Sequence, residues 1–96
     1  MYKIEYTKEA ENNLRDLKKK GDIAKLKKIK DAISKIQQDP RHPWLHTHKY
    51  QSFQTKNGED VFQSYVENHT PSACRIFWYY GPQSGIITII AVTPHP

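Results

Sequence analysis

The stretch "ACRIFWYYGPQSGIITIIAVT", residues 73–93, contains two strands separated by a turn. Residues 73–80 alternate and are rich in aromatic and branched side chains, which is typical of a half-buried strand. Residues 86–93 are apolar on both faces, which indicates a central or covered strand. Arg75 breaks this pattern, because no carboxylate lies within seven residues of it on either side. The pair therefore predicts the middle of a sheet that carries one cation without a local partner.

Two further strands are predicted just upstream, at 47–53 ("THKYQSF") and 61–67 ("VFQSYVE"). Turns at 56–58 ("KNG") and 68–71 ("NHTP") separate them from each other and from residues 73–80. Four consecutive strands with short turns predict an antiparallel meander. Residues 41–46 ("RHPWLH") are expected to be a loop, because Pro43 forbids regular structure there.

The N-terminal half predicts a strand at 2–6 ("YKIEY") followed by two helices. Thr7 and Asp22 are expected as the N-caps of these helices, and Gly21 as the left-handed residue that ends the first. The second helix should end at Asp39 and Pro40. Because the link between the helices is so short, we expect an antiparallel helix hairpin.

The expected fold is therefore α+β, with the order β-α-α-β-β-β-β in a single domain over residues 1–96. The helices have apolar stripes that must cover one face of the sheet, which leaves the other face partly open. Alternation along 73–80 places Cys74, Ile76, Trp78 and Tyr80 on the covered face. Arg75 then points into the open face, together with Phe77 and Tyr79.

Composition limits the class of protein. The chain has 96 residues, 36% of them hydrophobic, and a net charge of +5. It has no apolar run of about 18 residues and no apolar signal core at its start. Its single cysteine, Cys74, excludes an internal disulfide and fits a reducing cytoplasm. A small basic cytoplasmic domain favours nucleic acid or an acidic protein as its partner.

The element order and three short motifs, "HTHKY", "ACRIFWYY" and "TPHP", resemble the RelE/ParE superfamily of bacterial toxins, closest to the RelE/YoeB type. The matching positions are Lys49, the early strand arginine Arg75 and the near-terminal histidine His95. The resemblance implies a ribosome-dependent mRNA endonuclease that inhibits translation. It also implies a cognate antitoxin, and binding of operator DNA by the toxin–antitoxin complex.

Two positions depart from the YoeB-like pattern. His46 stands where those toxins carry a glutamate, and Pro96 follows His95 where they carry a tyrosine. These departures keep two alternatives open. One is a ParE-like inhibitor of DNA gyrase on the same scaffold, and the other is a catalytically degenerate relative that binds RNA or protein.

Cleavage of RNA through its own 2′-hydroxyl needs a base, a cation that stabilises the phosphorane, and an acid for the leaving oxygen. No metal or cofactor is required in principle. Arg75 suits the cation role, because its guanidinium can bind two phosphate oxygens at once. His95 suits the acid role, and His46 or His48 the base role.

Four further residues are candidates for binding RNA. Lys49 can contact phosphate, and Tyr50, Tyr65 and Tyr79 can stack on nucleobases, although strand tyrosines are more often core residues. Arg75 has its own structural alternative, which is an ion pair with Glu67 across the turn at 68–71. The histidines at 42, 46 and 48 match no common zinc spacing, so no metal site is expected.

Overall fold

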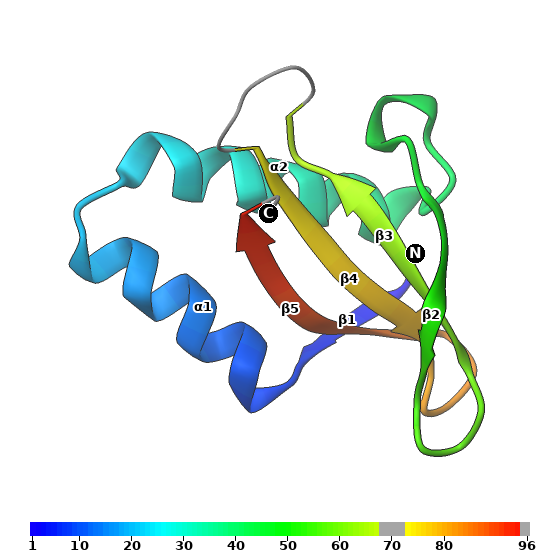
Figure 1. Ribbon diagram of the computed structural model, residues 1–96. Helices are drawn as coiled ribbons and strands as arrows, with labels where there is room; N and C mark the ends of the chain where they lie inside the picture. Colours follow the sequence, from blue (N-terminus) through cyan, green and yellow to red (C-terminus); the bar gives the residue numbers. More distant parts are fainter. Residues whose placement is uncertain (68–72, 95–96) are drawn as a thin grey trace.

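The computed structural model describes residues 1–67 and 73–94. Its order of elements matches the predicted β-α-α-β-β-β-β arrangement, with one turn of 3₁₀ helix before the last four strands (Figure 1). Within the described ranges the elements are β1 (Lys3–Tyr6), α1 (Lys8–Lys19), α2 (Ile23–Gln38), η1 (Pro43–Leu45), β2 (His48–Gln54), β3 (Asp60–Tyr65), β4 (Cys74–Tyr80) and β5 (Ile86–Pro94).

The strands form one mixed sheet in the spatial order β1-β5-β4-β3-β2. β2 to β5 are the predicted antiparallel meander. β1 adds to the outer side of β5 in parallel, with Lys3 opposite Ile86. β5 therefore lies between two strands, as its apolar sequence on both faces predicted.

Both helices begin at the predicted caps. Thr7 Oγ1 accepts a hydrogen bond from the Ala10 amide at 3.1 Å, and Asp22 Oδ1 accepts one from the Lys25 amide at 3.3 Å. These bonds satisfy amides that have no partner inside the helix. Gly21 lies between the helices with φ of +72°, a left-handed conformation that costs glycine little. Local sequence therefore determines where both helices begin and where the chain turns between them.

The core lies between the helices and one face of the sheet. Burial alternates along β4, where Cys74, Ile76 and Trp78 are buried and Arg75 and Phe77 are partly exposed. This confirms the predicted division of the strand into a covered and an open face. The helices bury the apolar stripes expected for them, including Ala10, Leu26, Ile29, Ile33 and Ile36.

A chain of hydrogen bonds ties this core to the segment that precedes β2. Trp78 Nε1 donates to Ser64 Oγ at 2.8 Å, Ser64 Oγ lies 2.6 Å from Thr47 Oγ1, and the Thr47 hydroxyl donates to the Pro40 carbonyl at 3.1 Å. Because Thr47 uses its one hydrogen on that carbonyl, the Ser64 hydroxyl donates to Thr47. The side-chain polar atoms of Trp78, Ser64 and Thr47 are therefore all hydrogen-bonded.

The segment 41–46 is more ordered than its sequence predicted. Pro43–Leu45 form one turn of 3₁₀ helix, and His42 Nδ1 accepts a hydrogen bond from the Trp44 amide at 3.1 Å. The expectation of an irregular loop was wrong because proline is well tolerated in the first turn of a helix, where its missing N–H is not needed. The turn also buries Leu45, which is 1% exposed.

β5 contains a bulge that matters for the open face. Phe77 pairs with Ala91 and Trp78 pairs with Ile89, so Ile90 is an extra residue on β5. The bulge changes the alternation, so that Ile89 before it and Val92 after it both contribute to the core. The backbone of β5 near the bulge is also bound by α1, through the Asn13 side chain that accepts from the Val92 amide at 2.9 Å.

The thiol of Cys74 should be nearly unreactive in the folded chain. Cys74 is 3% exposed. Burial, with smaller effects of neighbouring charges, raises the pKa of its thiol above the ordinary 9.0. The thiolate is the reactive form, so a chromogenic disulfide reagent should label the native protein at least about 100-fold more slowly than the unfolded chain.

The same shift has a consequence for stability at alkaline pH. A pKa raised by folding favours the neutral thiol, so its contribution to stability is complete below pH 9.0 and is lost as the pH rises through the folded value. Thermal unfolding of Cys74→Ala should therefore depend less on pH above 9 than that of the parent chain. If the melting temperatures of the two proteins fell equally with pH above 9, or if the native thiol were labelled rapidly, the assigned burial of Cys74 would be wrong.

None of the helices in the described part of the chain is both long enough and apolar enough to cross a membrane.

Candidate functional site

The open face is the side of the sheet that points away from the helices, and the strand register determines which side chains it carries. Arg75 lies opposite Tyr65 on β3 and Thr93 on β5. Gln63 lies opposite Phe77 on β4 and His48 on β2. Since paired residues share a face of a sheet, all of these side chains lie on one surface. The open face thus includes His48, Tyr50, Gln63, Tyr65, Arg75, Phe77, Tyr79 and Thr93. Lys3 and Glu5 of β1 lie on the same face at its outer edge, because Glu5 lies opposite Thr88, which lies opposite Tyr79.

Arg75 lies near the start of β4, the central strand of the sheet, and no carboxylate among the described residues contacts it. Its Nη1 donates to Gln63 Oε1 at 2.5 Å, and its Cζ lies 5.5 Å from the centre of the Phe77 ring. Its Nε is buried and has no hydrogen-bond partner in residues 1–67 and 73–94. An unsatisfied buried donor is uncommon in native proteins and requires an explanation. One amide oxygen therefore orients the guanidinium and leaves its charge available to a ligand.

The ion pair considered as an alternative for Arg75 is not formed. The Glu67 carboxylate lies 3.2 Å from Lys28 Nζ on α2. Within the described ranges Arg75 makes no ion pair with any residue. The carboxylate therefore stabilises the junction of β3 with α2 and does not neutralise the open face.

His48 lies on the open face with its proton placement determined by the backbone. Its Nδ1 is 3.0 Å from the His46 carbonyl oxygen. A carbonyl can only accept, so Nδ1 carries the hydrogen, and in the neutral ring Nε2 is left with a free electron pair. The ring also lies 5.6 Å from that of Tyr65, which faces Arg75 on the next strand. His48 and Arg75 are two strands apart and two residues out of register, so their backbones are separated by about 12 Å.

The three tyrosines expected to contact RNA are all on the open face and all partly exposed. Tyr50 meets the Phe77 ring edge-on, with the ring centres 5.2 Å apart. Tyr65 lies between His48 and Arg75. Tyr79 lies beside Gly81, where an added Cβ would come within 3.2 Å of the tyrosine ring. Tyr50 and Tyr65 are therefore grouped with Arg75, whereas Tyr79 lies at the far end of β4.

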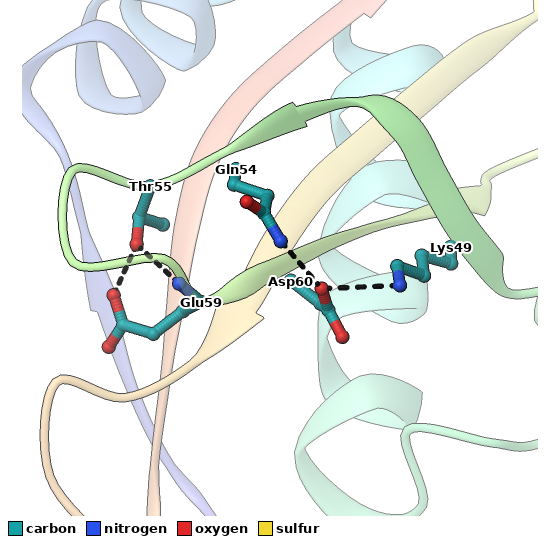
Figure 2. A network of polar contacts seen from close by, with 5 residues as sticks. All are labelled: Lys49, Gln54, Thr55, Glu59 and Asp60. Atoms are coloured by element: carbon teal, nitrogen blue, oxygen red, sulfur yellow. Dashed lines mark hydrogen bonds and ion pairs between the residues drawn. The ribbon is translucent and has the colours of Figure 1, made fainter.

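Lys49 is not brought together with Arg75. It follows His48 on β2, so its side chain points to the other face, and it lies opposite Phe62, whose ring stacks on the core residue Trp78. Figure 2 shows its ammonium group beside Asp60, at 3.3 Å, in the hairpin that joins β2 and β3. Gln54 donates to the same carboxylate oxygen at 3.3 Å. Lys49 thus helps to close the hairpin.

The hairpin is completed by Thr55 and Glu59, which are also drawn in Figure 2. The Thr55 hydroxyl donates to the Glu59 carboxylate and accepts from the Glu59 amide, the latter at 3.1 Å. These bonds give the tip of β2 and β3 a defined shape, which matters because β2 carries His48 and Tyr50.

His46 is also separated from Arg75. It has φ of +47°, the left-handed conformation, and ends the 3₁₀ turn immediately before β2 begins at His48. It lines a different hollow, with Trp44, Val66 and Glu67. The strand starts after His46, so the alternation that would have put His46 and His48 on one face does not apply.

The remaining predicted catalytic residue, His95, lies outside the described residues. Of the histidines at 42, 46 and 48, His42 and His48 each use Nδ1 in a hydrogen bond with a nearby backbone group. No group of three His, Cys, Asp or Glu side chains that could hold a metal ion occurs in residues 1–67 and 73–94.

Sequence reasoning missed Gln63, the residue that orients Arg75. Gln63 is 7% exposed. A buried glutamine in a strand needs a partner, and the one available cation on the neighbouring strand supplies it. The signal was present in "VFQSYVE", where alternation puts Gln63 and Tyr65 on one face. Choosing that face required the register between β3 and β4.

The comparisons with known proteins agree on the fold. A YoeB/ParE toxin from Agrobacterium tumefaciens superimposes with a TM-score of 0.72 at 12% identity, over 98% of this chain and 99% of the other. A metal-bound toxin from Helicobacter pylori gives 0.71 at 20% identity, over 99% and 96%. RelE in an archaeal RelE–RelB complex from Pyrococcus horikoshii gives 0.67 at 14% identity, over 97% and 93%. No protein-family model and no curated protein sequence matches the chain.

The chain therefore has the fold of the RelE/ParE toxin superfamily over nearly its whole length. The predicted resemblance is confirmed at the level of the fold.

Proposed function

We propose that this protein is the toxin of a toxin–antitoxin pair and that it cleaves mRNA on the ribosome through the RNA 2′-hydroxyl. The observation that carries the proposal is the setting of Arg75, a permanent cation that Gln63 orients on an aromatic open face. A guanidinium binds two phosphate oxygens at once and stays charged at every relevant pH. Arg75 would stabilise the extra negative charge of the phosphorane.

His48 is the better of the two proposed bases. Its Nδ1 is bonded to the His46 carbonyl, so the neutral ring presents Nε2 as a proton acceptor for the 2′-hydroxyl. A nucleotide lying over Tyr65 would contact both His48 and Arg75, since Tyr65 lies between them. His95 stays the proposed acid for the leaving 5′ oxygen, and this assignment rests on the resemblance alone.

The proposed partner is an antitoxin with acidic and apolar residues. The P. horikoshii relative was solved as a RelE–RelB complex, which supports a protein partner for this fold. A net charge of +5 favours an acidic chain, and also the phosphates of ribosomal RNA, to which the lysines of α2 would add salt-sensitive attraction. Binding of operator DNA through the antitoxin complex is proposed on the same resemblance.

Induced expression in bacteria tests the function. Growth should stop within one doubling, and mapping of mRNA 5′ ends should show new cuts inside translated regions. Ribosomes purified with a defined mRNA should reproduce the cuts. Growth arrest with intact mRNA would overturn the nuclease proposal. If that arrest came with DNA damage and were unaffected by Arg75→Ala, it would favour the gyrase alternative.

A further inference from the structure

A hollow of about 300 Å³ lies on the open face beside Arg75. Its walls come from four strands and from the first turn of α1. Most of the lining is aromatic or apolar, and the lining residues include Tyr50, Phe53, Val61, Phe77, Thr93 and Glu9. The volume is at the lower end of sites for small molecules, which suits one nucleobase.

Contacts between α1 and β5 hold Glu9 at this hollow. The hydroxyl of Thr7 donates to the Ile90 carbonyl at 2.6 Å, and Asn13 accepts from the Val92 amide at 2.9 Å. Thr7 precedes Glu9 in the chain and Asn13 follows it. The start of α1 is therefore attached to β5 on both sides of Glu9, close to the bulge. Glu9 is the only charged residue in the lining among the described residues, it lies exposed at the rim, and it makes no ion pair within the described part of the chain.

Phe77 and Thr93 connect the hollow to the proposed phosphate site. The Arg75 guanidinium lies against the Phe77 ring, which also lines the hollow. Thr93 lines the hollow and lies opposite Arg75 in the sheet. A phosphate held by Arg75 and a base in the hollow could therefore belong to the same or to adjacent nucleotides.

A carboxylate in such a place discriminates among bases. The aromatic rings of Tyr50 and Phe53 can stack on any base, which gives affinity without selectivity. An ionised carboxylate only accepts hydrogen bonds. Guanine presents two adjacent donors, N1–H and N2–H, that match its two oxygens. Adenine and cytosine each place an acceptor beside their one amino group, and uracil places a carbonyl on each side of its one N–H.

We propose that this hollow binds a guanine base of the RNA and that Glu9 is the residue that determines this specificity. The inference rests on the proposed function, because it assumes that RNA lies on the open face. It adds a base preference, and a residue of α1, to a site otherwise built from the sheet.

Binding of the four ribonucleoside 5′-monophosphates to the purified full-length chain tests the proposal. By calorimetry or NMR titration, GMP should bind at least about ten-fold more tightly than AMP, CMP or UMP, as one bidentate contact allows. Glu9→Gln should remove that preference. The matched control is Glu11→Gln, because Glu11 is the other acidic residue of the same helical turn and does not line the hollow.

The outcomes separate this inference from the proposed function. Equal binding of all four nucleotides, no binding of GMP, or a guanine preference that survives Glu9→Gln would overturn the guanine site. Those results leave the nuclease proposal standing if the mapped mRNA cuts still depend on Arg75. A guanine preference that requires Glu9, in a protein that cuts no mRNA, would keep the site and overturn the nuclease.

Discussion

Arg75→Ala should lower the rate of ribosome-dependent mRNA cleavage by about 10²–10³-fold, the usual effect of removing one group that stabilises transition-state charge. The guanidinium is a permanent cation on the open face, and Gln63 already holds it in place at 2.5 Å. In the proposed reaction, its loss would remove this positive charge from beside the phosphorane. Single-turnover cleavage of a defined mRNA on purified ribosomes measures the effect.

Two variants sharpen this experiment. Arg75→Lys keeps the charge but loses the planar pair of donors, so it should fall between the parent and Arg75→Ala. Arg15→Ala removes the same charge from an exposed position on α1, where the guanidinium donates a hydrogen bond to Asn12 in the same helix. It should leave cleavage unchanged. A folded Arg75→Ala protein with parental cleavage would exclude the proposed mechanism.

Trp78→Ala should destabilise the fold by about 3–5 kcal/mol. Trp78 is fully buried, stacks on Phe62 with ring centres 5.0 Å apart, and donates to Ser64. The truncation opens a cavity and removes the donor at the start of the Ser64–Thr47–Pro40 chain. Because domains of this size are stable by only about 5–15 kcal/mol, the change removes a large part of the total. Chemical denaturation followed by circular dichroism measures it.

Trp44 provides the matched control. It is 74% exposed, and its ring makes a cation–π contact with Lys35 and an edge contact with the His42 ring. Trp44→Ala should therefore cost less than about 1 kcal/mol. If both tryptophan variants unfolded at the same denaturant concentration, the assignment of Trp78 as the centre of the core would be wrong.

The local features of the fold were predictable because each depends on residues close together in the chain. Thr7, Gly21 and Asp22 set the ends of the helices through bonds that span only a few residues. Alternation along β4 correctly placed Arg75 and Trp78 on opposite faces of the sheet, since successive side chains of a strand point to opposite faces.

The site was only partly predictable, because its parts meet through long-range pairing. Alternation identified Arg75 and the tyrosines, but the partner of Arg75 depends on the register of β3 against β4. His46 is separated from the candidate site by a left-handed turn, which its residue type does not signal in the sequence. Lys49 follows His48 on β2, so alternation places it on the other face, where it pairs with Asp60.

By itself, the amino-acid sequence determined the order of the elements, the caps of the helices and which face of β4 carries its cation. These follow from backbone geometry and from the hydrophobic effect acting over neighbouring residues. Only the tertiary structure decided that β1 joins β5 in parallel, that Gln63 holds Arg75, and that Glu9 reaches the open face. The physical reason is that these features depend on pairing between distant segments. The bonds from Thr7 and Asn13 to β5 span 83 and 79 positions, and the bulge at Ile90 is defined only by the pairing of β5 with β4, so no local pattern encodes them.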